Sequence, residues 1–296
     1  MITLENERLR VELPEPGQTP DDTYRFDRAG FISEVVLDGT HHFCASEPLN
    51  LVHPSSGGRG LCCEFKADYS SEVEDGQYYP KWGIGLLRKD GPYCFHRRYK
   101  DCTIFPVSYR KEPGKVIFKT EAIPCIGYAM EEEKTVSLDG NCLTLSATVK
   151  NVGGKTITTE EYCHNFLSVD GMAISPDYRL TFLSSQKLDS KVIKNEKEYS
   201  NPCNITGLDD GLGIARCETS VSYARIPVVA DSGEKFMWKL EHKGVGLSVI
   251  SADHIQFNQM MVWICDHIFA PEVIQKFTVQ PREIYSWSRS WIFEAQ

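Results

Sequence analysis

VSLDGNCLTLSATVK, residues 136–150, is the stretch of sequence that decides the fold. From Leu143 to Val149 every second residue is apolar, and the residues between them are serine or threonine. Side chains of a strand point alternately to its two faces, so this pattern predicts a β-strand with one buried and one polar face. Asp139 and Gly140, just before it, supply the positive φ values of a tight hairpin turn. The stretch therefore predicts two antiparallel strands joined by a short turn.

Turn signals of the same kind recur along the chain. Asp-Gly occurs six times, with the aspartates at residues 38, 75, 90, 139, 170 and 210. The C-terminal stretch IYSWSRSWIF, residues 284–293, has aromatic residues on one side and serines on the other, with Arg289 as the charged exception. No window of a dozen residues has the apolar spacing of an amphipathic helix. Hairpins bury their apolar faces by stacking sheets, so the predicted fold class is all-β, a large antiparallel β-sandwich.

A single domain is expected over residues 1–296. Hydrophobic residues make up 41% of the chain, which is enough for a sizeable core. No Pro/Ser/Gly-rich linker divides the sequence, and no repeat of roughly 20 to 50 residues is visible. The most polar region, residues 184–213, is expected to be a loop-rich insertion near a sheet edge.

Composition excludes several classes of partner. Asp and Glu number 41 against 32 Lys and Arg, a formal charge of -9, which argues against a nucleic-acid partner because phosphate binding needs clustered basic residues. No apolar run approaches the roughly 18 residues of a membrane span, and the N-terminus lacks a signal-peptide pattern. The 11 cysteines form no C-x-x-C pair, which favours reduced thiols. The cytoplasm is the expected location.

One imidazole stands out as a candidate functional group. EEYCHNFLSVDG, residues 160–171, places His164 among aromatic residues shortly before an Asp-Gly turn. A lone histidine on a strand is often a core residue whose ring is satisfied by a backbone carbonyl. The alternative is an imidazole aimed into a pocket, where an ordinary pKa of about 6.5 suits proton transfer near neutral pH.

The longer stretch ATVKNVGGKTITTEEYCHNFLSVDG, residues 147–171, resembles the central segment of the aldose 1-epimerase (galactose mutarotase-like) superfamily. Supporting segments follow in the family's order: YRFDRAGFISEVVLDG at 24–39, GGRG at 57–60, KWGIGLL at 81–87 and FTVQPREIYSWSRSWIF at 277–293. The resemblance spans about residues 20 to 295. It implies a β-supersandwich with a sugar site on a concave face.

The resemblance also implies two catalytic groups. The family's histidine falls at His164, and its second group is a Glu near the C-terminus. The comparable region here, MMVWICDHIFAPEVIQKF at 260–277, departs from the family pattern. Two carboxylates therefore compete for the second role, Glu272 and Asp266, and Glu272 is favoured. Either could instead be a surface charge.

These groups suit chemistry at an anomeric carbon. Opening a cyclic sugar removes the anomeric hydroxyl proton while the ring oxygen is protonated, and closure on the other face reverses those roles. We expect His164 to act as the acid and a carboxylate as the base, with no metal or organic cofactor. The eight histidines show no H-x-x-x-H or H-E-x-x-H spacing, so no metal site is expected.

A sugar also needs aromatic faces and bidentate polar partners. The candidate substrate-binding residues are Arg59, Trp82, His96, Arg97 and Asp177, with Arg98 and Arg179 as further possibilities. Each of them has an ordinary structural role as its alternative. Arg59 is the best of them, because the glycines around it let the backbone approach a ligand closely.

The predicted function is an aldose 1-epimerase-like isomerase whose partner is a carbohydrate small molecule. The first alternative is a non-catalytic carbohydrate-binding protein on the same fold. The second is a different sugar reaction, such as lyase chemistry on an acidic sugar. One scaffold supports many activities, so a fold resemblance leaves these three open.

Overall fold

The computed structural model describes residues 1–16, 18, 24–47, 56–94, 97, 99, 101–183, 205–214, 222–226 (backbone only) and 235–296. The described part is built of antiparallel strands, together with the short 3-10 helix η2 (Ser70–Glu72), and contains no α-helix. None of its helical segments is long and apolar enough to cross a membrane. The all-β fold class is confirmed.

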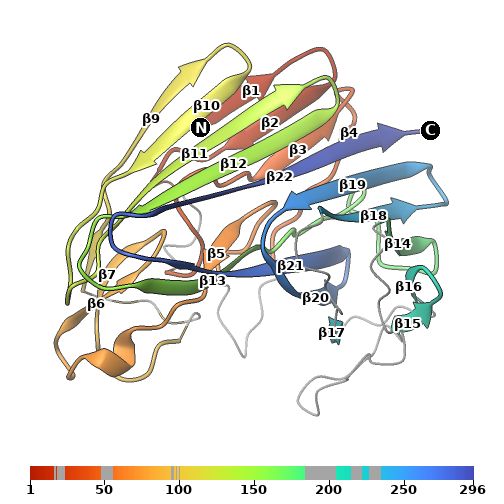
Figure 1. Ribbon diagram of the computed structural model, residues 1–296. Helices are drawn as coiled ribbons and strands as arrows, with labels where there is room; N and C mark the ends of the chain where they lie inside the picture. Colours follow the sequence, from red (N-terminus) through yellow and green to blue (C-terminus); the bar gives the residue numbers. More distant parts are fainter. Residues whose placement is uncertain are drawn as a thin grey trace.

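The strands of the described residues form two large sheets and two small ones (Figure 1). The ten-stranded sheet has the order β15 (Ile205–Leu208), β16 (Gly211–Ile214), β14 (Tyr178–Phe182), β18 (Phe236–His242), β19 (Leu247–His254), β22 (Ile284–Ala295), β12 (Cys142–Asn151), β11 (Met130–Asp139), β10 (Lys115–Thr120), β9 (Val107–Glu112). The five-stranded sheet has the order β17 (Ser222–Ile226), β20 (Phe257–Cys265), β21 (Ile268–Val279), β13 (Ile157–Cys163), β5 (Cys63–Phe65).

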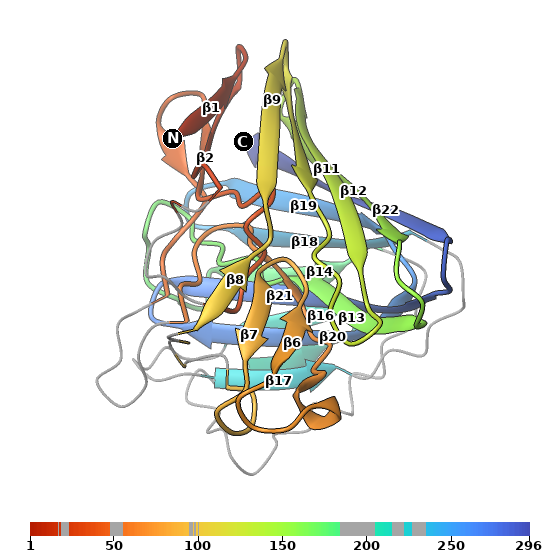
Figure 2. The same cartoon turned by 90° about the vertical axis from the view of Figure 1, so that its left-hand side faces the viewer.

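The smaller sheets flank this pair (Figure 2). The four-stranded sheet consists of β1 (Ile2–Glu5), β2 (Leu9–Leu13), β3 (Glu34–Leu37) and β4 (His41–His42), in that order. The three-stranded sheet consists of β6 (Tyr78–Lys81), β7 (Gly85–Arg88) and β8 (Cys102–Ile104). Every strand pair in the four sheets is antiparallel, as hairpin connections require.

The two clearest turn signals form the predicted hairpins. Asp139 pairs with Cys142 where β11 turns into β12, and Gly140 has a φ of 56°. Asp38 and Gly39 have φ values of 51° and 71° between β3 and β4. Positive φ at these positions matches the right-handed twist of the strands, which is why Asp-Gly marks them.

The main core lies between the two large sheets. Leu145 and Val149 of β12 share one apolar cluster with Val273 and Phe277 of β21. The opposite face of the five-stranded sheet carries separate, smaller clusters, one of which contains Tyr162, Met261 and Ile274. That face therefore belongs to a different environment from the sandwich interior.

Part of the polar region at 184–213 forms strands, where a loop-rich insertion was expected. Residues 184–204 lie outside the described residues. The remainder is not a loop: β15 and β16 form a hairpin at the edge of the ten-stranded sheet, with Leu208 paired to Gly211. Its apolar residues Ile205, Leu212 and Ile214 are buried in the main core. The apolar pattern of these strands is short and lies among polar residues, so it was too weak to predict the hairpin from the sequence.

Candidate functional site

His164 and Glu272 meet just beyond the paired part of β13 and β21. The last pair of that ladder joins Cys163 to Val273, and the next residues on the two strands are His164 and Glu272. Cys163 and Val273 face the main core, and successive strand residues alternate between faces, so the next pair faces outward. His164 Nε2 lies 3.3 Å from Glu272 Oε1. The register of two strands thus brings an imidazole and a carboxylate into contact.

Aromatic rings fix the plane of the His164 imidazole. The Phe166 ring stacks on it with centroids 3.8 Å apart and an interplanar angle of 6°. Phe26 and Trp263 present ring edges to it at 5.9 Å and 5.8 Å. His164 is only 3% exposed, and its Nδ1 atom has no hydrogen-bond partner among the described residues. The ring is held in one orientation, with Nε2 directed at Glu272.

A charged network adjoins the pair on the same face. Arg25 donates hydrogen bonds to Glu64 at 2.8 Å, to Ser56 Oγ at 2.9 Å and to the Tyr162 hydroxyl at 2.9 Å. The Tyr162 hydroxyl in turn donates to Glu64 at 2.6 Å, across the β5–β13 ladder. Burial opposes ionisation of Glu64, but Arg25 and Lys81 outweigh it and lower the pKa of Glu64 to about 2. Glu64 is therefore a fixed negative charge that anchors Arg25.

Burial acts on the protonation of both members of the pair. It raises the pKa of Glu272 to about 7, against the opposing charges of Arg25 and Lys66. Burial also lowers the pKa of His164 well below its ordinary value, and the nearby Arg25 charge adds to that effect. Near neutral pH the imidazole is therefore uncharged, while Glu272 exchanges its proton readily. Perturbations of this kind concentrate at functional sites.

Structural comparison places this architecture among known folds. Matches over almost the whole chain include a galactose mutarotase related enzyme from Lactobacillus acidophilus (TM-score 0.62, 13% identity, 99% of this chain and 97% of that one). A galactose mutarotase-like protein from Lactobacillus casei ATCC 334 matches with a TM-score of 0.59 and 13% identity, over 99% of this chain and 100% of that one. The chain has the galactose mutarotase-like fold.

A more distant match extends the same result. An aldose epimerase homologue from C. elegans matches with a TM-score of 0.52 and 9% identity, over 99% of this chain and 98% of that one. The sequence itself matches no protein-family model and no curated protein. The galactose mutarotase-like architecture is thus shared, and at these identities the likeness concerns the fold alone.

Within this galactose mutarotase-like fold, Asp266 lies away from His164. Cys265 pairs with Ile268, so Asp266 and His267 form the two-residue turn between β20 and β21. Asp266 has a φ of 48°, a turn conformation that aspartate tolerates. Glu272 lies six positions further along the chain, roughly 20 Å of extended chain. Glu272, and not Asp266, is the carboxylate next to His164.

The predicted sugar contacts do not gather around the pair. Trp82 is 1% exposed in the main core, where its Nε1 donates to the Tyr69 hydroxyl at 3.2 Å. Arg59 is partly buried and donates from Nε to the Ser33 carbonyl at 3.1 Å. Arg97 pairs with Asp90 near the surface. Trp82, Arg59 and Arg97 therefore each have a structural partner within the protein.

The remaining candidates are peripheral or outside the described part. Asp177 is exposed just before β14, and Arg179 pairs with Asp210 at 2.6 Å. His96 and Arg98 lie outside the described residues. A substrate-binding role for any of these candidates stays a prediction.

Sequence patterns missed several residues of the site. Tyr162 is two positions before His164 on the same strand, so the period-two rule could have placed it on the same face. Trp263 lies on β20 and is partly buried. Arg25 and Glu64 are far apart in the sequence, and no local sequence pattern predicts their contact.

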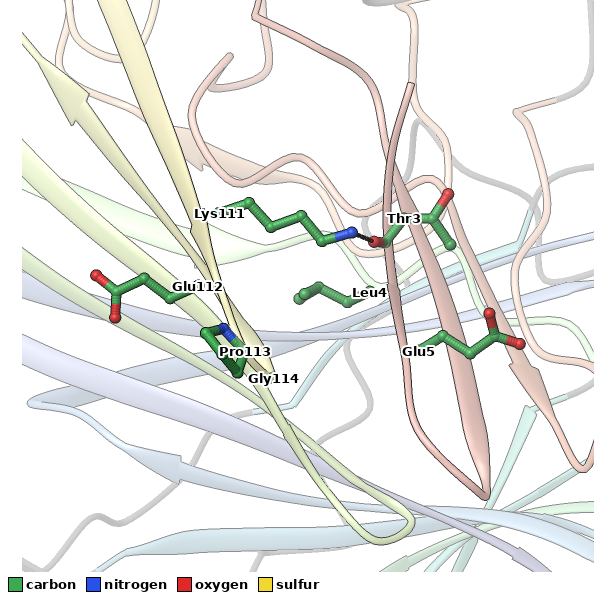
Figure 3. A pocket seen from close by; sticks show the side chains of 7 residues that line it. All are labelled: Thr3, Leu4, Glu5, Lys111, Glu112, Pro113 and Gly114. Atoms are coloured by element: carbon green, nitrogen blue, oxygen red, sulfur yellow. Dashed lines mark hydrogen bonds between the residues drawn. The ribbon is translucent and has the colours of Figure 1, made fainter.

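The two surface pockets found among the described residues do not include the pair. A surface pocket of about 390 Å³ is lined by Thr3, Leu4, Glu5, Lys111, Glu112, Pro113 and Gly114 (Figure 3). A smaller one, of about 260 Å³, lies at the β18–β19 hairpin. Among the described residues, no group of three or more His, Cys, Asp or Glu is placed to hold a metal ion. The candidate site is therefore defined by the chemistry of the pair.

Proposed function

We propose that this protein is a cofactor-free isomerase that interconverts the anomers of a sugar or sugar derivative, with His164 and Glu272 as its acid/base pair. The observation that supports this most is the 3.3 Å contact between Nε2 and Oε1 of two buried groups. Two groups in contact that together hold one proton can give a proton to one sugar oxygen and take one from another. Anomeric exchange needs those two transfers.

The proposed reaction exchanges the roles expected from the sequence: Glu272 in its acid form protonates the ring oxygen, while neutral His164 accepts the anomeric hydroxyl proton. The bond between the anomeric carbon and the ring oxygen breaks, which leaves an open-chain aldehyde and a new hydroxyl. After rotation about the adjacent carbon–carbon bond, Glu272 takes back the hydroxyl proton as the ring closes. His164 then returns its proton to the anomeric oxygen. The raised pKa of Glu272, about 7, supports Glu272 as the acid of the opening step.

The sugar must approach beside the pair, because a 3.3 Å separation leaves no room for a ring between the two side chains. Trp263 is partly buried and lies on the same face, so its ring can cover the apolar C–H face of a sugar. The Arg25 side chain is 13% exposed and reaches the surface next to the pair. These two residues mark the side from which substrate would enter.

Saturation-transfer NMR on a panel of free and phosphorylated aldoses tests the proposal. The expected result is faster exchange between the α and β anomers of at least one sugar in the presence of the protein. Saturation of a sugar without faster exchange would favour the carbohydrate-binding alternative. Formation of an unsaturated product from an acidic sugar would favour a lyase. Either outcome would contradict an isomerase.

A further inference from the structure

The residue after His164 has an unusual conformation for a buried side chain. Asn165 has a φ of 53° and is only 2% exposed. Asparagine tolerates this left-handed region better than most residues, but it remains uncommon outside glycine. The backbone leaves the regular ladder at this residue and pairs with β21 again, in the same register, at Leu167 and Phe269.

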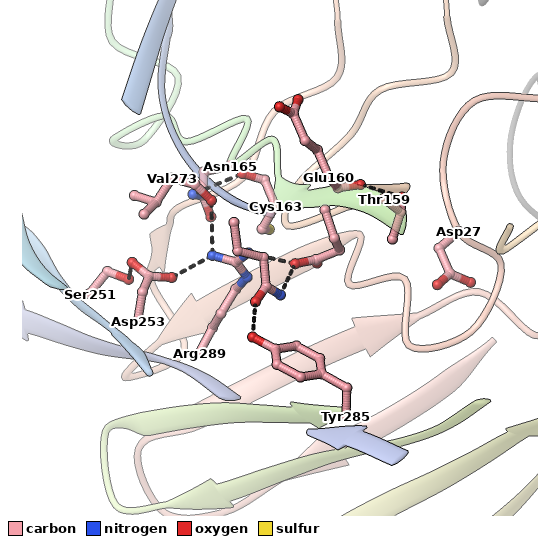
Figure 4. Close-up of polar contacts among 12 residues, drawn as sticks. Asp27, Thr159, Glu160, Cys163, Asn165, Ser251, Asp253, Val273, Tyr285 and Arg289 are labelled. Carbon is pink, nitrogen blue, oxygen red and sulfur yellow. Dashed lines mark hydrogen bonds and ion pairs between the residues drawn. The ribbon is translucent and has the colours of Figure 1, made fainter. Parts of the chain in front are cut away.

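The partner strand explains why backbone pairing is interrupted at Asn165. Continuing the β13–β21 register, Asn165 would lie opposite Pro271, which has no N–H to donate. The Asn165 side chain takes over the missing contact. Its Nδ2 donates to the Pro271 carbonyl at 2.6 Å. The same Nδ2 donates to the Cys163 carbonyl at 3.3 Å (Figure 4). An amide group thus ties the chain next to His164 to the residue that precedes Glu272.

A third contact connects this amide to the other large sheet. Trp291 of β22 is fully buried and donates from Nε1 to Asn165 Oδ1 at 3.1 Å. The amide side chain both donates to Pro271 and accepts from Trp291; an ionised aspartate has no donor, and glycine has neither group. Behind it, Arg289 of β22 donates to the Val273 carbonyl at 3.2 Å and to Glu161 at 2.7 Å (Figure 4).

We propose that Asn165 is a positioning residue that holds His164 and Glu272 in register for proton transfer. This inference rests on the proposed function. Asn165 does not touch the proposed reacting atoms; it fixes the backbone on both sides of the pair through one buried amide. Catalytic pairs lose rate steeply when supporting contacts allow them to drift, because the reacting geometry is then populated less often.

The test compares Asn165→Gly with the matched variant Asn151→Gly. Glycine preserves the left-handed backbone and removes the amide. Asn151 is also buried, and its Nδ2 donates to the Val279 carbonyl at 2.9 Å, at the far end of the same strand β21. We expect similar losses of Tm. Only Asn165→Gly should lower kcat, by about tenfold or more, with KM within about threefold.

A second readout is independent of turnover. The titration of His164, followed by NMR of histidine-labelled protein, should respond to Glu272→Gln in the wild-type background. That response should fall to about half or less in Asn165→Gly, since it depends on the separation of the two groups, and should persist in Asn151→Gly. If wild-type protein exchanges no sugar, the proposed function fails and this titration alone decides the positioning role.

These measurements distinguish a positioning role of Asn165 from a purely structural one. An undiminished response in folded Asn165→Gly, or equal loss of kcat in Asn151→Gly, overturns the proposal. If Asn165→Gly does not fold, Asn165→Asp replaces it, because aspartate keeps the acceptor for Trp291 and loses the donor to Pro271. If neither variant folds while Asn151→Gly does, Asn165 is a folding residue and the proposal is wrong.

Discussion

His164 and Glu272 face each other across β13 and β21, one residue beyond Cys163 and Val273, the last pair of the continuous ladder. Their separation is therefore set by a strand register that the main core enforces. A slip of either strand by one residue would send its member of the pair to the opposite face and separate the two groups, so the contact depends on the correct register.

The rate of anomeric exchange should depend on pH through the one proton that the pair holds. Activity should fall as pH rises through about 7, because Glu272 then loses its proton. It should fall again at low pH, below the lowered pKa of His164, because the imidazole is then charged. The profile of kcat/KM against pH measures both limbs. A flat profile from pH 5 to pH 9 would remove the pair from the reaction.

Glu272→Gln should stabilise the protein at alkaline pH while it abolishes turnover. The folded-state pKa of about 7 lies above the ordinary 4.5, so the folded protein binds this proton more tightly than the unfolded chain. That contribution to stability is complete below pH 4.5 and is lost as pH rises towards 7. The variant should therefore exceed wild type by about 3 kcal/mol at pH 8, and by less than about 1 kcal/mol at pH 4.

Urea unfolding at the two pH values measures this difference, with Glu132→Gln as the control. Glu132 is another buried carboxyl, and burial together with the Asp27 charge raises its pKa to about 8. Its replacement should shift stability in the same direction and leave turnover unchanged. Equal stabilisation of Glu272→Gln at both pH values would show that Glu272 does not carry a raised pKa.

Gly58→Ala should disturb the ring that supports His164. A methyl group at Gly58 would lie 2.1 Å from Cζ of Phe166, whose buried ring stacks on the imidazole. Moving that ring should cost about 1–3 kcal/mol of stability and lower kcat. Gly154→Ala is the control, because an added methyl there meets no atom within 4 Å. Thermal unfolding and exchange rates of the two variants check the prediction; matching behaviour would mean that the stack is unimportant.

Local sequence patterns predicted the fold class because strands and tight turns each leave a short-range pattern in the sequence. The alternation at Leu143–Val149 and the turn at Asp139–Gly140 each depend on neighbouring residues only, and both appear in the β11–β12 hairpin. The β15–β16 hairpin was not predicted, because its few apolar residues lie within a polar region.

The site was only partly predictable, because it depends on long-range pairing. His164 came from a family resemblance, and the choice between Glu272 and Asp266 stayed open until the register of β13 and β21 was known. Trp82 was a candidate for stacking on a sugar, but it lies in the main core. An aromatic side chain near glycines is compatible with either role, so the sequence pattern did not distinguish them. Arg25 and Glu64 meet only in the folded chain.

The most direct measurement is the rate of exchange between sugar anomers with His164→Asn, Glu272→Gln and Asp266→Asn, compared with wild type on the sugar that responds best. The first two variants should lose about a hundredfold or more of the rate while keeping their fold, because each removes one proton-transfer group. Asp266→Asn should retain the wild-type rate, since its turn is distant from the pair. Full activity in Glu272→Gln, or loss confined to Asp266→Asn, would contradict the account.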